Sequence, residues 1–464
     1  MRNPMNHSPE YRRRRFFNWF PLGLTYATYY MGRYNLNVSS TTIMGQFHLS
    51  KADFGMIATA GFWTYALAVA FNGPLADRIG GKKSILIGAA GAAVLNLTIG
   101  LLFLSGWQTK IIVGMSLLYA VNMYFQSFGA LSVVKVNAPW FHVRERGVFG
   151  GVFGMMIACG YFLAFTVGGW MLSHMAWYWV FIIPSGLLAV MFVVDALVVK
   201  DKPSEAGFPD FATGDATSGD ADKNKPVDFA YLVRRVFTNR VILTIIAAEF
   251  CTGFVRQGVM LWFVPFLKEV HGVAAGTMSV TIAWPRVMTD LFSMTSSGMR
   301  LDVFAIASTG ITVGGILGGL LCGFLSDRVF GSRRPPVAFL FYLGQIVALV
   351  ALGQATSPVV AALLIPFTCL WIFGVHGMLS GTSAMDFGGT RAAATVAGIC
   401  DGVQYIASGL TGFALGGMLD KYGWSWWTWM IIPFSVVGAL LMTRLWNETP
   451  LKARKQGAAA HAGH

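Results

Sequence analysis

Two arginines, Arg33 and Arg256, lie inside long apolar stretches of this chain. A charged side chain at the centre of a bilayer costs at least about 2.5–3.5 kcal/mol on insertion scales, so a residue kept there indicates a function. A guanidinium stays charged at any working pH, and its planar donors match a tetrahedral oxyanion or a carboxylate. The two arginines occupy corresponding places in the two halves of the chain. We therefore predict that they converge on one small anion; the alternative is that each pairs with a buried acid, such as Glu249 for Arg256.

Two tyrosines share a helix face with the first of these arginines. Tyr26, Tyr30 and Arg33 are spaced i, i+4, i+7, which places them on one side of a helix. Tyrosine hydroxyls supply hydrogen-bond donors without adding net charge. This face is therefore suited to surround an anion.

Three other ionisable residues, Glu249, Asp401 and His376, fall within apolar stretches. Glu249 lies seven residues before Arg256, and Asp401 lies four before Tyr405, so each pair shares a helix face. They are candidates for coupling transport to protons or for balancing charge. A purely structural hydrogen-bonding role is equally open for each.

These side chains require a membrane-spanning framework. Of the 464 residues, 55% are apolar and 12% are charged, and the mean hydropathy is +0.58. Soluble chains carry about 25% charged residues. About 20 residues form a helix long enough to cross the hydrocarbon core. We predict an all-α membrane protein with twelve transmembrane helices in two pseudo-symmetric six-helix bundles, the spans lying near residues 16–38, 54–76, 84–105, 111–134, 147–172, 177–199, 241–267, 301–325, 337–356, 359–380, 393–418 and 426–446.

The division of the chain follows from these spans. We expect an N-terminal bundle over 1–199, a polar cytoplasmic linker over 200–240 and a C-terminal bundle over 241–446. An extra, partly apolar segment near 272–298 has no counterpart in the first half, and it is either an interfacial lid or a plain loop. Residues 447–464 form a cytoplasmic tail.

The basic residues set the orientation. Lys and Arg number 34 against 21 Asp and Glu, a net charge of +13. Most of them lie on the side that holds the N-terminus. The exceptions outside the spans are few: Lys51, Lys110, Lys268, Arg286, Arg300 and Lys421. By the positive-inside rule both termini are cytoplasmic. The excess charge is therefore a topology signal from a protein in the lipid bilayer, expected to be a bacterial inner (plasma) membrane, and not a nucleic-acid footprint.

A short motif occurs twice, at matching positions of the two halves. Gly-x-Leu-x-Asp-Arg ends at Asp77 and Arg78 after the second span and at Asp327 and Arg328 after the eighth, each followed by glycine and bases. An acid beside bases at a helix end can pair across the bundle interface and separate when the bundles rock. We predict conformational gating by these residues; the alternative is a simple positive-inside tether.

The chain lacks motifs of other function classes. We find no nucleophile–base pair, no metal-ligand spacing and no phosphate-binding loop of the nucleotide-hydrolase type, and the five cysteines are widely spaced within spans. We expect no enzyme activity, no cofactor and no metal site.

Several segments resemble one transporter family. The run Tyr26–Asn35 resembles the Y-x-x-Y-Y-x-x-R-x-N pattern in span 1 of the organophosphate:phosphate antiporters of the major facilitator superfamily, which include glycerol-3-phosphate and hexose-phosphate transporters. Arg256–Trp262 and Leu267–Val270 are similar to the family's span 7. The segment from Trp140 to Gly147 is similar to its loop 4–5 signature and adds Arg146 to the gating residues.

The resemblance implies a site and an activity. Arg33 and Arg256 would grip the phosphate, and four tyrosines would line the central cavity: Tyr26, Tyr30, Tyr65 and Tyr405. Val69, Ile157 and Leu261 stand where the family has polar residues, which leaves other organic anions open.

We therefore expect a secondary active transporter, acting as a monomer, that exchanges an organophosphate for inorganic phosphate by rocker-switch alternating access. One alternative is a proton-coupled symporter of an organic anion such as a phosphonate, sulfonate or sugar acid. Another is a membrane sensor that binds a phosphorylated metabolite without transporting it.

Overall fold

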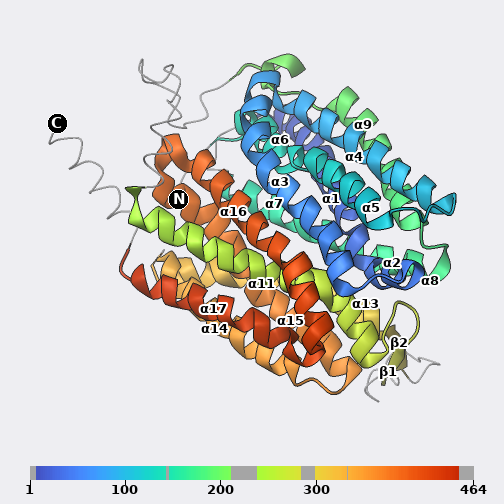
Figure 1. Cartoon of the computed structure of the whole chain (residues 1–464). Coiled ribbons are helices and arrows are strands. Elements are labelled where there is room, and N and C mark those ends of the chain that lie inside the picture. The colour runs from blue at the N-terminus through green and yellow to red at the C-terminus, as the bar shows by residue number, and fades with distance from the viewer. Residues whose placement is uncertain (1–6, 143–145, 211–237, 284–297, 332, 449–464) are drawn as a thin grey trace.

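The computed structural model describes residues 7–142, 146–210, 238–283, 298–331 and 333–448. Within these, only the backbone is described for 146–153, 281–283, 298–300 and 381–397. Long helices run side by side, and α2, α8 and a small β-hairpin gather at one end of the molecule (Figure 1). We call this the hairpin end.

The first half of the chain forms helices up to residue 206. They are α1 (Pro9–Val38), α2 (Ser40–Phe47), α3 (Lys51–Ile79), α4 (Gly81–Leu104), α5 (Ile111–Gln126), α6 (Phe128–Asn137), η1 (Ala138–Trp140), α7 (Arg146–Tyr161), η2 (Phe162–Val167), α8 (Gly168–His174), α9 (Trp179–Val198) and η3 (Pro203–Ala206).

The second half begins at residue 240. Its elements are α11 (Arg240–His271), β1 (Ser279–Ala283), β2 (Gly298–Asp302), α13 (Val303–Phe324), η5 (Leu325–Val329), α14 (Arg334–Gly353), α15 (Pro358–His376), η6 (Gly377–Ser383), α16 (Ala384–Tyr422), η7 (Trp424–Trp426) and α17 (Trp427–Arg444).

Each of the twelve expected spans coincides with a helix or with consecutive helices. Ten of the helices in the described part are long and apolar enough to cross a membrane; α1 and α16 lie outside that count. The helix of the fourth span is interrupted at Ser127, whose hydroxyl donates a hydrogen bond to the carbonyl of Tyr124 at 2.7 Å. The fifth contains the π-helical turn η2.

Local sequence explains several helix ends. Ser50 and Asp53 form a capping box at the start of α3, in which each side chain accepts the other residue's backbone N–H. Asn239 caps α11 through its side-chain oxygen. α11 ends at His271, and the next residue, Gly272, has a φ of 68°, in the left-handed region that glycine adopts without strain.

The extra segment of the second half contains the two strands, an addition to the predicted all-α fold. β1 and β2 pair antiparallel with Ser279 opposite Asp302. Asp302 binds the backbone N–H of Gly276 at 3.0 Å and that of Phe304 at 3.1 Å, so it ties the hairpin to the start of α13. Residues 284–297, most of the predicted insert, lie outside the described part.

The first residues of the predicted linker pack on the first half. The Asn18 side chain donates to the carbonyl of Lys200 at 3.2 Å and accepts its N–H at 2.8 Å. Asp201 accepts the backbone N–H of Lys82 at 2.8 Å. Residues 211–237 of the linker lie outside the described residues.

Candidate functional site

Arg33 of α1 is buried, with 1% of its surface exposed. Its Nη1 donates to the hydroxyl of Tyr405 of α16 at 2.9 Å, and its Nη2 lies 3.5 Å from both the backbone and side-chain oxygens of Gln126. The guanidinium carbon is 4.7 Å from the ring centroid of Tyr65 and 5.1 Å from that of Tyr30. Arg33 therefore reaches across to the second half through a tyrosine.

Arg256 of α11 is 2% exposed and makes the reciprocal contacts. Its Nη1 lies 3.3 Å from the hydroxyl of Tyr161 and 3.5 Å from that of Tyr34, both of the first half. Its Nη2 donates to Oε1 of Gln404 at 3.0 Å. Its guanidinium carbon is 5.5 Å from the ring centroid of Tyr405. Tyr405 thus contacts both arginines.

The four tyrosines predicted from sequence are buried together near Arg33. The rings of Tyr65 and Tyr405 lie 4.1 Å apart between centroids. Tyr30 lies 5.3 Å from Tyr26. The spacing argument therefore placed Tyr26 and Tyr30 near Arg33 correctly. Their role in binding remains a prediction.

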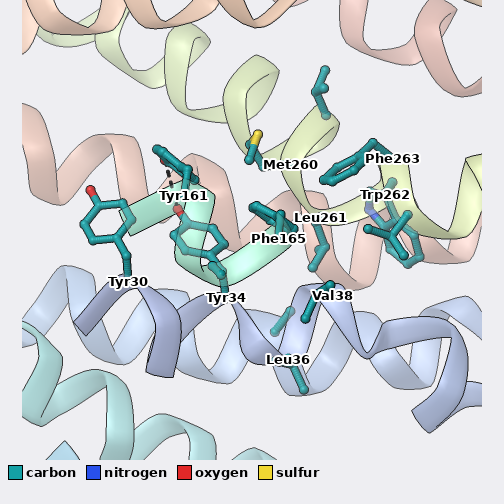
Figure 2. Close-up of a cluster of buried hydrophobic side chains, with 14 of the residues drawn as sticks. Tyr30, Tyr34, Leu36, Val38, Tyr161, Phe165, Met260, Leu261, Trp262 and Phe263 are labelled. Atoms are coloured by element: carbon teal, nitrogen blue, oxygen red, sulfur yellow. Dashed lines mark hydrogen bonds between the residues drawn. The ribbon is translucent and has the colours of Figure 1, made fainter. Parts of the chain in front are cut away.

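The two tyrosines that hold Arg256 were not among the predicted site residues. Tyr34 and Tyr161 face each other, with hydroxyls 3.4 Å apart (Figure 2). Tyr34 follows Arg33 directly and so falls off the face that Tyr26 and Tyr30 share. Adjacency to the arginine in the chain was the signal that could have found it.

Every hydrogen-bond partner of the two guanidinium groups described above is a neutral oxygen. Within the described residues neither Arg33 nor Arg256 forms a salt bridge, and the Nε atom of each is buried without a hydrogen-bond partner. Buried charges and donors are normally paired. The site therefore offers two cations with free donors to an anion.

Glu249 does not pair directly with Arg256, which was the alternative drawn from the sequence. Gln404 lies between them: its Nε2 is 3.3 Å from Oε2 of Glu249 and 2.7 Å from Nδ1 of His376. His376 Nδ1 is 3.7 Å from Oε2 of Glu249. Asp401 is half-buried one turn before Gln404. The structure thus gathers the three predicted coupling candidates beside Arg256.

The acids of the repeated motif pair within their own halves. Asp77 accepts from Nζ of Lys135 of α6 at 2.6 Å. Asp327 accepts from Nη1 of Arg334 of α14 at 2.8 Å. Both partners come from neighbouring helices of the same half. Pairing of the motif acids across the halves during gating stays a prediction.

The other predicted gating residues are Arg78, Arg328 and Arg146. Arg78 and Arg328 are exposed. Arg146 begins α7, and its side chain lies outside the described part of the chain. Their role in gating stays a prediction.

At the hairpin end, a carboxylate helix cap and an ion pair connect the two halves. Asp420 of α16 accepts the backbone N–H groups of Lys51 and Ala52 at 3.1 and 2.8 Å and so caps α3 from the other half. Lys51 Nζ lies 2.9 Å from Oε2 of Glu269 of α11, which also accepts from Nε1 of Trp424 at 2.8 Å.

The contact continues inward along α3 and α16. Thr59 donates to the carbonyl of Gly409 at 2.6 Å and accepts the N–H of Phe413 at 3.0 Å. Gly55 and Gly412 meet so closely that a Cβ on either would clash with the carbonyl oxygen of the other. The hairpin end is therefore tightly closed along these two helices.

These features define a helical membrane protein whose two halves meet around a pair of buried arginines. The sequence profile of the Major Facilitator Superfamily matches residues 22–410 of this chain. The chain belongs to this superfamily, which confirms the fold class predicted from the sequence.

Relatives cover nearly the whole chain. A glycerol-3-phosphate transporter of Bacillus subtilis (strain 168) is 26% identical over 94% of this chain and 93% of its own length. The membrane sensor protein UhpC of Escherichia coli (strain K12) is 24% identical over 93% and 92%. Among solved structures, a bacterial homologue of the human lysosomal transporter Spinster, in an inward-facing and unoccupied conformation, has a TM-score of 0.70 at 17% identity, covering 97% and 98% of the two chains. The predicted resemblance to organophosphate transporters is thereby confirmed.

Proposed function

We propose that this protein is a secondary transporter of a phosphorylated organic anion, which it exchanges for inorganic phosphate. The observation that carries the proposal is the pair Arg33 and Arg256, buried without a salt bridge in the described residues, each with an unpartnered Nε. The relative named as a glycerol-3-phosphate transporter supports the phosphate class. Guanidinium groups suit phosphate because two parallel N–H donors meet two oxygens.

The site would bind its anion by exchanging partners. A phosphate oxygen would replace Tyr405 on Arg33, and another would replace Gln404 on Arg256. The apolar residues at Val69, Ile157 and Leu261 favour a substrate with a larger or less polar organic part.

Exchange would follow from alternating access. Binding between the two halves lowers the cost of enclosing both charges, so the loaded carrier rocks and the empty one stalls. Opening at the hairpin end would require separating Lys51 from Glu269 and Asp420 from α3. We place the protein, as a monomer, in a bacterial inner membrane with cytoplasmic termini, because its basic residues are distributed in that sense and the relatives above are bacterial.

Transport in proteoliposomes tests this function. Vesicles that contain purified protein and are loaded with inorganic phosphate should take up labelled glycerol-3-phosphate, and vesicles without internal phosphate should not. Arg33→Lys and Arg256→Lys should abolish uptake while the protein still inserts. Arg444→Lys, at an exposed arginine of α17, is the matched control. Near-normal uptake by either site variant would refute the assignment.

Proton-coupled symport is a second candidate, favoured by the buried contacts from Arg256 through Gln404 to Glu249. Symport predicts net uptake into phosphate-free vesicles that external acid stimulates. Exchange predicts uptake that depends on internal phosphate.

A sensor function is a third candidate, because the E. coli relative is named a membrane sensor. A sensor would bind inorganic phosphate or glycerol-3-phosphate in solution and transport neither in vesicles.

A further inference from the structure

We infer that Gln404 is a positioning residue whose side-chain amide turns between Arg256 and Glu249, so that binding of the anion is coupled to binding of one proton. The inference rests on the proposed function, since it concerns how Arg256 becomes available to the anion. It concerns a residue that the spacing argument did not place in the site.

The orientation of the Gln404 amide is fixed by its neighbours. A guanidinium offers donors alone, so the amide oxygen Oε1 must face Nη2 of Arg256, at 3.0 Å. The amide nitrogen Nε2 must then face Glu249 and His376, at 3.3 and 2.7 Å. The Gln404 amide nitrogen is a donor alone, so both neighbours must accept. Nδ1 of His376 therefore accepts, which puts the imidazole proton on the other ring nitrogen, Nε2 of His376, and Glu249 presents an acceptor oxygen.

A proton on Glu249 would reverse these requirements. A hydroxyl on the unpartnered Oε1 of Glu249 would find no acceptor among the described residues, so we place the proton on Oε2. Oε2 then donates, and the acceptor available to it on Gln404 is Oε1, so the amide would turn that oxygen toward Glu249. His376 must donate to the same oxygen, which it does when its imidazole proton moves to Nδ1. The amide nitrogen would then face Arg256, where two donors meet and need a shared acceptor. An oxygen of a bound anion is such an acceptor, because it can accept one hydrogen bond from the guanidinium and one from the amide. The proton and the anion therefore favour the same amide orientation.

Burial makes Glu249 a suitable proton site. Its side chain is fully buried, and its Oε1 has no hydrogen-bond partner among the residues that the structure describes. An ionised carboxylate in this position lacks the full set of donors that normally compensates burial. The added proton also offsets the charge of the incoming anion.

Among the residues whose side chains the structure describes, the ionisable groups around Glu249 come from four helices. They are Arg256 on its own helix α11, Tyr342 of α14, His376 of α15, and Cys400 and Asp401 of α16. Tyr342 is already engaged with Thr252 and the carbonyl of Ala248. Gln404 bonds to Arg256 as well as to Glu249, which makes the amide the link between the proton and the anion site.

The test is calorimetric titration of the purified protein with inorganic phosphate over a series of pH values. Phosphate itself titrates in this range, but it does so equally for every variant. The ratio of the affinities of two variants therefore reports only the pH dependence that comes from the protein. Relative to Glu249→Gln, the affinity of the wild type should fall by up to about tenfold per pH unit as Glu249 ionises. Gln404→Met, of similar size, should follow Glu249→Gln. The control is Gln345→Met, at a buried glutamine of α14 bound to Ser435, which should follow the wild type.

The outcomes separate the amide from simple charge repulsion. A pH-dependent ratio that persists in Gln404→Met but vanishes in Glu249→Gln overturns the role of Gln404. A ratio that does not change with pH overturns the coupling, while phosphate binding itself keeps the proposed function intact. No binding by the wild type at any pH contradicts both. If Gln404→Met does not fold, Gln404→Glu serves instead: it should hold Arg256 at alkaline pH and recover phosphate binding in acid, and unaltered binding would overturn the inference.

Discussion

The hydroxyl of Tyr405 lies 2.9 Å from Nη1 of Arg33, so a tyrosine of the second half accepts a hydrogen bond from the arginine of the first. Arg256 is bound in the opposite sense, by Tyr34 and Tyr161 of the first half. Each arginine therefore bonds to tyrosine of the half that does not carry it, as well as to a glutamine of its own half, Gln126 for Arg33 and Gln404 for Arg256. In our account an anion takes over part of this bonding and joins the same two halves.

Tyr405→Phe should destabilise the empty protein. The variant keeps the ring beside Tyr65 but leaves Nη1 of Arg33 without its acceptor, a loss of about 1–3 kcal/mol in the free energy of unfolding. Added phosphate should restore part of it, so the rise in Tm on phosphate addition should exceed that of the wild type. Thermal unfolding with and without phosphate measures this. Tyr422→Phe, at an exposed tyrosine, is the control, and identical phosphate shifts in Tyr405→Phe and the wild type would argue against the exchange of partners.

Asp420→Ala should open the hairpin end. Loss of a helix cap costs about 0.5–2 kcal/mol, and here the cap joins the two halves. Spin labels at Gly45 and Lys421, on opposite halves at this end, should report a greater population of long distances. Asp53→Ala removes a capping interaction of the same helix within one half and should leave the distances unchanged. Equal effects of the two substitutions would mean that Asp420 stabilises α3 and not the closed state.

Gly412→Ala should slow exchange by preventing closure. Its Cβ would meet the carbonyl oxygen of Gly55, and overpacking of this kind costs about 1–3 kcal/mol. The closed form should lose roughly 5- to 150-fold in population. Gly417→Ala on the same helix is the control, because its Cβ makes an ordinary 3.9 Å contact with Ala52. Wild-type phosphate exchange rates in proteoliposomes with Gly412→Ala would contradict the need for this close approach.

Asp77→Asn should affect transport more than stability. The pair Asp77–Lys135 is largely exposed, with 68% and 43% of the two side chains accessible, so its loss should change the free energy of unfolding by less than about 1 kcal/mol. If Asp77 exchanges partners during gating, Asp77→Asn slows phosphate exchange, while Lys135→Gln slows it less. Equal transport by both variants and the wild type would leave the motif as an orientation signal alone.

The sequence predicted the parts of the site that lie along one helix. Intramembrane charge pointed to Arg33 and Arg256, and helical spacing placed Tyr26 and Tyr30 beside Arg33. Spacing within a helix says nothing of which residues of other helices approach it. The partners of Arg256 could not be found in this way.

One buried acid, Asp195, was missed although it falls inside the predicted span 177–199, where the intramembrane-charge argument applies to it. Asp195 of α9 is fully buried and accepts from Thr25 of α1 at 2.7 Å, a contact between residues far apart in the chain. The β-hairpin was also missed, although polar and apolar residues alternate along both strands, because each strand is only five residues long. Twelve long apolar runs, in contrast, required no knowledge of tertiary contacts.

The central claim is that Arg33 and Arg256 jointly bind one phosphate group. Calorimetric titration of purified Arg33→Lys and Arg256→Lys with inorganic phosphate tests it most directly, with Arg444→Lys as control. Loss of a buried charged hydrogen-bond partner costs about 2–5 kcal/mol, so each site variant should lose at least about thirtyfold in affinity while the control binds as the wild type does. Phosphate affinity in either site variant equal to that of the wild type would contradict the account.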